Sequence, residues 1–244
     1  MVNSAGTRTP PLSKDHPCAT AFLDETGAIA KDRIFAVGLL KLAEPSTLLR
    51  AVQKWRDKRH WYREIKYYDV TRGSLDLYRE VVDVALDTCD SAFFCFVADR
   101  DVADPVERFG TQWDAYEKLA EQLVLAAIRP PELLTLLADN YSTPDDVLFE
   151  ETLRANVNRR LGRLAVTSVC RLDSRSADGL QVVDLLTAAI ALEFRIAAGI
   201  ASETSVKAEL AKHVRDRLGT ESCLGGWRTA RHSVAIYRST GSLG

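Results

Sequence analysis

The chain has 244 residues, 46% of them hydrophobic and 27% charged, and its formal net charge is −2. This composition is typical of a soluble globular protein with a full hydrophobic core. The five cysteines are scattered, odd in number and outside any CxxC or Cys/His metal spacing. Their pattern argues against a disulfide framework and a zinc site, and it favours the reducing cytoplasm.

The N-terminal residues 1–18 are polar and rich in proline, and they contain no apolar stretch. We expect a disordered leader there and not a signal peptide. No repeat or long linker divides the rest of the chain. We therefore expect residues 19–244 to form a single domain, with a helical and strand extension at its C-terminal end.

Strands and helices are predicted to alternate along most of the chain, which favours an α/β fold, or mixed α+β layers, around a central sheet. Pro45 is expected to open a helix, Pro130 and Pro131 to stop one, and Gly162 to cap another. Apolar runs and helical spacing predict strands at residues 19–23, 34–42, 92–98, 133–138 and 165–172, and helices from residue 45, over 75–85, 106–128 and 145–161, from 177, and over 205–218.

Residues 180–200 form the longest apolar stretch and have about the length of a membrane span. They contain Asp184, Glu193 and Arg195. Because a charge near the centre of a membrane helix costs roughly 2.5 to 3.5 kcal/mol, we expect a buried helix of a soluble protein here. Within this helix Gln181, Asp184 and Thr187 recur at steps of three and predict a narrow polar stripe on an apolar cylinder.

Three more aspartates, Asp24, Asp99 and Asp139, stand at the ends of apolar strands. A buried carboxylate is costly without a cation or hydrogen bonds, so several converging carboxylates indicate a divalent metal such as Mg²⁺. Two such ions about 4 Å apart stabilise both the attacking and the leaving oxygen of a phosphodiester displacement. A simpler interpretation stays open, in which strand-end aspartates are turn or N-cap residues and Asp184 pairs with a buried arginine such as Arg171 or Arg175.

The order of these residues along the chain resembles the bacterial and archaeal proteins catalogued as domain of unknown function 3800, which are grouped with ribonuclease-H-like folds. The resemblance spans residues 20 to about 195 and depends on the combination of its motifs, with Thr26 in place of the commoner serine. The matching segments are FLDETG (22–27), EIK (64–66), WDAYEKLAEQLV (113–124), LLADN (136–140), and Ser176 ahead of GLQVVDLL (179–186).

This resemblance implies an α/β, ribonuclease-H-like mixed central sheet flanked by helices, and a nuclease that uses Mg²⁺ or Mn²⁺. Asp24 on the first strand is implied as a shared metal ligand, with Glu64 and Asp139 approaching from the flanks and Asp184 from the late helix. Lys66 would orient the attacking water or offset charge on the phosphate. A role in defence against foreign nucleic acid is a further implication of the family.

Glu25 and Gln181 are expected to support the site without leading it. Side chains alternate along a strand, so Glu25 is expected to point to the face opposite Asp24. Gln181 precedes Asp184 on the polar stripe of the late helix.

A basic and aromatic segment, residues 50–68, carries a net charge of +5 in this weakly acidic chain. Lys58, Arg59 and Arg63 are predicted to contact nucleic-acid phosphates, with neighbouring aromatic rings stacking on bases. The alternative is a solvated helix face anchored to the core by Trp55 and Trp61.

Two other hypotheses stay open. Asp24 or an upstream acid, together with the Glu64-x-Lys66 element, also resembles the D…ExK pattern of restriction-endonuclease-like enzymes, in which Asp184 would have no catalytic role. Alternatively, the chain is a non-catalytic module that binds nucleic acid or protein on a nuclease-like scaffold. The chain has no phosphate-binding GxxxxGK[ST] loop, GxSxG elbow, HExxH motif or Rossmann glycine pattern.

Overall fold

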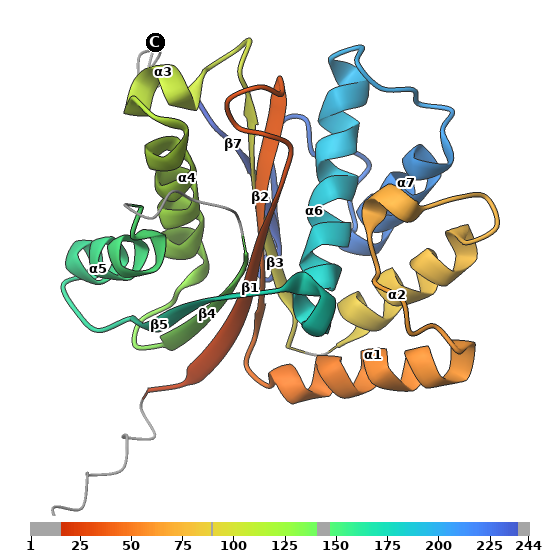
Figure 1. Cartoon of the computed structure of the whole chain (residues 1–244), viewed down its shortest axis with the longest axis horizontal. Helices are drawn as coiled ribbons and strands as arrows, with labels where there is room; N and C mark the ends of the chain where they lie inside the picture. The colour runs from red at the N-terminus through yellow and green to blue at the C-terminus, as the bar shows by residue number, and fades with distance from the viewer. Residues whose placement is uncertain (1–15, 89, 141–146, 239–244) are drawn as a thin grey trace, which may run out of the picture.

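The computed structural model describes residues 16–88, 90–140 and 147–238, whose strands form one seven-stranded mixed sheet with helices on both faces (Figure 1). The strands are β1 (Cys18–Thr26), β2 (Ile34–Leu42), β3 (Ala92–Asp99), β4 (Leu133–Asp139), β5 (Val166–Leu172), β6 (Trp227–Arg228) and β7 (Ser233–Ile236). The helices are α1 (Pro45–Arg59), α2 (Leu75–Asp87), α3 (Pro105–Phe109), α4 (Gln112–Ala127), α5 (Phe149–Leu161), α6 (Asp178–Ala197) and α7 (Val206–Leu218), with short 3₁₀ turns η1 (Tyr67–Asp69) and η2 (Ser174–Ser176).

The strand order is β5-β4-β1-β2-β3-β7-β6. β1 is antiparallel to β2 and parallel to β4, which is in turn parallel to β5, while β2 and β3 are antiparallel. This arrangement confirms the predicted α/β class with a mixed central sheet flanked by helices. β1 therefore lies inside the sheet, between β2 and β4.

Two hydrophobic cores form because the residues of β1 alternate between the faces of the sheet. Phe22 packs with α1, α2, α6 and α7, whereas Leu23 packs with α4 and α5 on the other face. In Figure 1, α4 and α5 cover one face, and α6, α7 and the α1–α2 pair cover the other. The predicted strand 34–42 is confirmed residue by residue, and all its side chains are buried.

Helix α6 lies unusually close to the sheet because two glycines remove side chains at the contact. A Cβ atom on Gly38 of β2 would stand 1.7 Å from Thr187 Oγ1, and one on Gly179 would stand 2.4 Å from the ring of Phe22. Thr187, the third member of the predicted polar stripe, thus packs on β2 and donates to Val183 O at 2.6 Å. This close packing fixes the height of α6 over β1 and β2.

Some predicted boundaries differ from the structure. The single helix predicted over 106–128 is wrong, because Gly110 adopts φ +97° and Thr111 caps a new helix, which separates α3 from α4. Most of the predicted leader 1–18 falls outside the described residues, and Cys18 already belongs to β1. The helix predicted from residue 145 begins at Phe149, with 145–146 outside the described residues. Gly162 caps it as predicted.

Within the described ranges, none of the helices combines the length and apolarity that a membrane crossing requires.

Candidate active site

A cavity of about 380 Å³ opens at the end of the central strands, and five carboxylates line it: Asp24, Glu25, Glu64, Asp139 and Asp184. The sheet register explains why the first and fourth meet. β1 and β4 are parallel, and Leu23 is paired with Ala138. The next residues of the two strands, Asp24 and Asp139, therefore lie near each other at the carboxyl ends of these strands. The four acids predicted as metal ligands therefore all line one cavity.

The burial of these acids has an electrostatic cost. Burial raises the pKa of Asp24 well above its usual value, and repulsion from Glu25, Asp184 and Asp139 raises it further. The pKa of Asp184 is likewise raised to about 6, mainly by burial. Repulsion from Asp139 and Glu64 contributes to this rise, and attraction to Lys66 opposes it. Mutual repulsion in a buried site is the electrostatic environment that a bound cation relieves.

Glu25 follows the predicted alternation, because it points toward α4 on the face opposite Asp24. There it accepts a hydrogen bond of 2.8 Å from the hydroxyl of Tyr116, whose ring stacks on Phe149 with centroids 5.0 Å apart. Burial raises the pKa of Glu25 to about 7, although the Tyr116 hydrogen bond opposes this shift. Its carboxylate nevertheless reaches the cavity, since β1 ends at the next residue.

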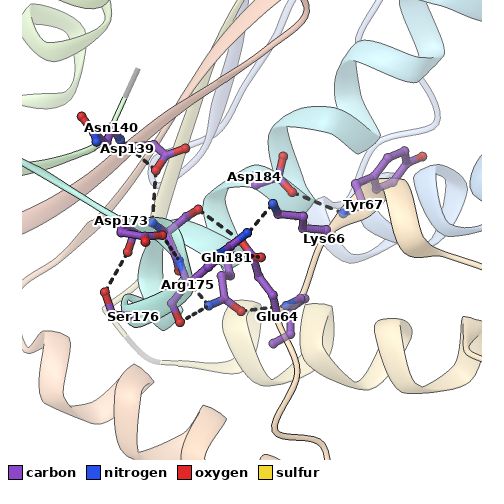
Figure 2. A network of polar contacts seen from close by, with 12 residues as sticks. Glu64, Lys66, Tyr67, Asp139, Asn140, Asp173, Arg175, Ser176, Gln181 and Asp184 are labelled. Carbon is purple, nitrogen blue, oxygen red and sulfur yellow. Dashed lines mark hydrogen bonds and ion pairs between the residues drawn. The ribbon is translucent and has the colours of Figure 1, made fainter. Parts of the chain in front are cut away.

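Backbone hydrogen bonds fix two of the aspartates from neighbouring segments. The N–H of Tyr67 donates to Asp184 Oδ2 at 3.3 Å, and the N–H of Ser174 donates to Asp139 Oδ1 at 3.2 Å. Figure 2 shows Asp139, Lys66 and Asp184 gathered around one space from β4, the segment before η1, and α6. These carboxylates are therefore held both by the strand or helix that carries them and by hydrogen bonds from segments distant in the sequence.

Gln181 positions the segment that carries Glu64 and Lys66. Its Oε1 accepts from the N–H of Ile65 at 2.7 Å, and its Nε2 donates to Ser174 O at 2.8 Å. Glu64 in turn contacts Lys66 Nζ at 3.2 Å and accepts from the Ser174 hydroxyl at 3.2 Å. Gln181 thus has the supporting position that the sequence predicts.

The simpler interpretation of Asp184 is not supported. Arg171 pairs with Glu150, and Arg175 lies 3.8 Å from Glu64, while Asp184 has no ion pair in the described part of the chain. Asp99, by contrast, fits the turn interpretation: it pairs with Arg33 at 3.0 Å, accepts from the N–H of residue 101, and does not line the cavity.

The donor chemistry of the cavity fits a hard divalent cation, because carboxylate oxygens are the ligands that Mg²⁺ and Mn²⁺ prefer. Asp24, Glu64, Asp139 and Asp184 would hold it. As they are placed, however, the described His, Cys, Asp and Glu residues form no group of three or more that could hold a metal ion.

The basic segment is more structural than its composition indicates. Arg56 is buried and bonded to Asp178 at 2.7 Å, and Arg59 pairs with Glu80. Trp55 and Trp61 are buried, as the solvated-face alternative expects. Arg63 stacks on the Trp61 ring at 3.8 Å and lines a shallow cavity that shares Glu64 and Gln181 with the main one. Lys58 is exposed at the end of α1.

Sequence reasoning missed several cavity residues. Arg195 lies on the same face of α6 as Asp184, so helical spacing along that face is a signal that indicates it. Ser174 and Lys207 come from separate elements and have no local signal, because only the tertiary fold brings them to the carboxylates.

No protein-family model and no curated protein sequence matches the chain. Two solved structures are distantly similar. One is of the PCNA:RNase HII complex from Archaeoglobus fulgidus, with 10% identity, a TM-score of 0.46, and coverage of 86% of this chain and 96% of that one. The other is Bst-RNase HIII in complex with Mn²⁺, with 14% identity, a TM-score of 0.43, and coverage of 87% and 68%.

Proposed function

We propose that this protein hydrolyses phosphodiester bonds of nucleic acid with Mg²⁺ or Mn²⁺ held by Asp24, Glu64, Asp139 and Asp184. The observation that carries the proposal is the convergence of these four acids on one cavity from β1, the segment before η1, β4 and α6. A fold does not need buried, mutually repelling carboxylates for stability, and such groups cluster at functional sites.

When bound, the metal would supply positive charge that neutralises the phosphate and favours attack by water. The residues of the chain supply the geometry. Gln181 and Ser174 orient Glu64, the N–H of Tyr67 orients Asp184, and these contacts limit the movement of the carboxylates during the reaction. Lys66 is exposed enough to leave Glu64 and donate to a phosphate oxygen.

The position of Asp184 favours this proposal over a restriction-endonuclease-like D…ExK mechanism. In that mechanism Asp24, Glu64 and Lys66 suffice, and the acid on the late helix has no function. Here Asp184 lines the same cavity as the other three, and the cation that lowers its pKa is Lys66. A non-catalytic binding module would not need the repulsion among these acids. Membership of the domain of unknown function 3800 family, and a role in defence, are proposals that rest on the motifs quoted above.

The test is cleavage of labelled DNA and RNA, single- and double-stranded, by purified protein in Mg²⁺, Mn²⁺ or EDTA. We expect cleavage with either metal and none in EDTA. Asp24→Asn and Asp184→Asn should each abolish it, whereas Asp216→Asn, on the exposed face of α7, should cleave like the wild type. Activity that survives in Asp184→Asn would favour the D…ExK mechanism, and no cleavage under any condition would favour the binding module.

A further inference from the structure

The carboxylate cavity is also lined by two cations that the proposed reaction does not use, Arg195 of α6 and Lys207 of α7. Among the described residues, neither of them forms an ion pair or donates a side-chain hydrogen bond. Arg56, which lines the neighbouring shallow cavity, is by contrast paired with Asp178. Two unpaired cations in a cavity rich in carboxylates require a reason.

Arg195 reaches the wall of the cavity from the end of a helical face. Asp184, Ala188, Leu192 and Arg195 follow one another at steps of four, four and three, and all four line the cavity. The Nη2 atom lies 3.2 Å from the place where a Cβ on Gly27 would stand, so the guanidinium rests on the loop that follows β1. Burial lowers the pKa of Arg195, and Asp32 and Tyr67 only partly offset this.

Lys207 stands beside an exposed aromatic ring. Its Nζ lies 4.6 Å from the centroid of Tyr68, whose surface is 83% exposed. The Tyr67 hydroxyl donates to Lys207 O at 2.7 Å, which fixes the start of α7 against η1. The result is an exposed aromatic ring with a cation beside it, and both residues line the cavity together with the apolar side chains of Ala188 and Leu192.

The cavity thus joins a cluster of acids to a pair of cations through an apolar wall. Asp24 and Gly27 are three residues apart, a span of at most about 10 Å in an extended chain. One strand of a stacked duplex advances about 3.4 Å along the helix axis per nucleotide, so a strand with one phosphate at the acids places another at Arg195 within about three nucleotides.

We propose that Arg195 and Lys207 form a phosphate-binding subsite that holds the backbone of the nucleic-acid strand next to the scissile phosphate, with Tyr68 as a stacking platform. This inference rests on the proposed function, which places the scissile phosphate at the acids. It adds the residues that bind the neighbouring phosphate. Arginine suits this role because its fork of donors matches phosphate oxygens.

The experiment measures binding of labelled single-stranded hexanucleotides, DNA and RNA, in Ca²⁺ at several salt concentrations. We expect Arg195→Gln to weaken binding by about tenfold or more, and to flatten the slope of log affinity against log salt by about 0.7 per lost phosphate contact. Lys207→Gln should act in the same direction, and Arg195→Lys should keep the slope. Arg154→Gln, an exposed arginine of α5 outside the cavity, should match the wild type.

Hexanucleotides with one neutral methylphosphonate linkage identify the phosphate. When the neutral linkage is the one that Arg195 contacts, Arg195→Gln should not weaken binding further. When the neutral linkage is at any other position, Arg195→Gln should weaken binding as much as it does with the unmodified strand. The same loss at every linkage, an unchanged slope, or wild-type protein that binds none of the hexanucleotides would overturn the subsite. Because binding is the readout, protein that binds in this pattern but never cleaves would refute the proposed nuclease activity and leave the subsite standing.

Discussion

Asp24 lies two residues before the end of β1 and Asp99 is the last residue of β3 in the same sheet, but their surroundings give them opposite roles. Asp99 has Arg33 beside it and lies on the rim of the sheet, where an ion pair and a turn satisfy its oxygens. Asp24 is buried among other acids, and within the described part of the chain only its Oδ1 accepts a hydrogen bond, from the N–H of Glu25. The sequence alone predicts both as strand-end acids, and only the neighbours decide which one faces a cation.

At Asp184 the first prediction separates a metal ligand from a core residue. Asp184→Asn removes one of several like charges and keeps an oxygen for the N–H of Tyr67, so the metal-free fold should be as stable as the wild type or more so. The wild type should gain about 2.7 kcal/mol at a hundredfold excess of Mn²⁺ over its dissociation constant, and the variant clearly less. Thermal melts in EDTA and in Mn²⁺ measure both quantities.

Asp99→Asn is the control for this experiment, because it changes a strand-end acid outside the cavity. Removing the Asp99 charge should weaken its contact with Arg33 and lower the stability of the fold equally in EDTA and in Mn²⁺. The variant should therefore gain as much stability from the metal as the wild type does. If Asp184→Asn instead melts far below the wild type in EDTA and responds to Mn²⁺ normally, Asp184 is a structural residue and not a ligand.

His232 gives the second prediction, on pH. Its Nδ1 accepts from the N–H of Phe93 at 3.0 Å, and burial, with a smaller effect of Arg231, lowers its pKa to about 4. Between pH 6.5 and 4 the unfolded chain therefore binds more protons than the fold, so stability is lost as the pH falls through this window. His232→Asn keeps an acceptor without the titration. Urea unfolding at pH 7 and pH 5 should show a loss smaller by about 1 kcal/mol in the variant than in the wild type, and equal losses would contradict the assignment.

At the scale of elements, α6 determines whether the site forms. Its polar stripe is readable from the sequence, and so is its apolar length, but its distance from the sheet depends on Gly38 and Gly179, which no periodic pattern marks. The break between α3 and α4 was missed for a related reason. A single glycine in the left-handed region, Gly110, overrides a helical pattern that otherwise continues through it.

Gly38→Ala tests this dependence on close packing and gives the third prediction. The new methyl group would stand 1.7 Å from Thr187 Oγ1, so α6 must move away from the sheet. We expect a loss of about 1 to 3 kcal/mol in unfolding free energy, the usual cost of overpacking, together with weaker Mn²⁺ stabilisation as Asp184 is displaced from Asp24.

Gly73→Ala is the matched control, because a Cβ there has no atom within 4 Å, and we expect a near-wild-type unfolding curve. Adding Thr187→Ala to Gly38→Ala should recover part of the lost stability, since the two side chains occupy one space. Additive losses in the double variant would show that the contact with Thr187 is not the reason for the effect.

At the scale of the whole molecule, local patterns predict the order of elements and the strand-end acids well. Asp24, Asp139 and Asp184 could be selected because they stand near strand ends or on a helical stripe, and parallel strands bring such ends together. Glu64 was selected only through the resemblance of its EIK segment to the family. Arg195 and Lys207 were not selected. Helical spacing from Asp184 indicates Arg195, whereas only the shared cavity distinguishes Lys207 from the basic residues that are common on surfaces. The surroundings of Lys58 and Arg59 were equally hidden, since their acidic neighbour Glu80 belongs to another helix.

The last prediction concerns the path of nucleic acid over the molecule. The basic segment carries a net +5, but Glu80 of α2 lies beside both Lys58 and Arg59 and offsets part of their charge. Arg63 and Arg175 instead line the shallow cavity that continues the carboxylate cavity, and the side chain of Arg175 is 77% exposed.

We therefore expect the double replacement of Arg63 and Arg175 by Gln to flatten the salt dependence of oligonucleotide binding by about 0.7 per contact on single strands. The double replacement of Lys58 and Arg59 by Gln should flatten it less. Binding isotherms of both variants from low to high salt measure these slopes, with circular dichroism as the check on folding. If the Lys58 and Arg59 pair has the larger effect, the strand crosses the end of α1 and not the shallow cavity.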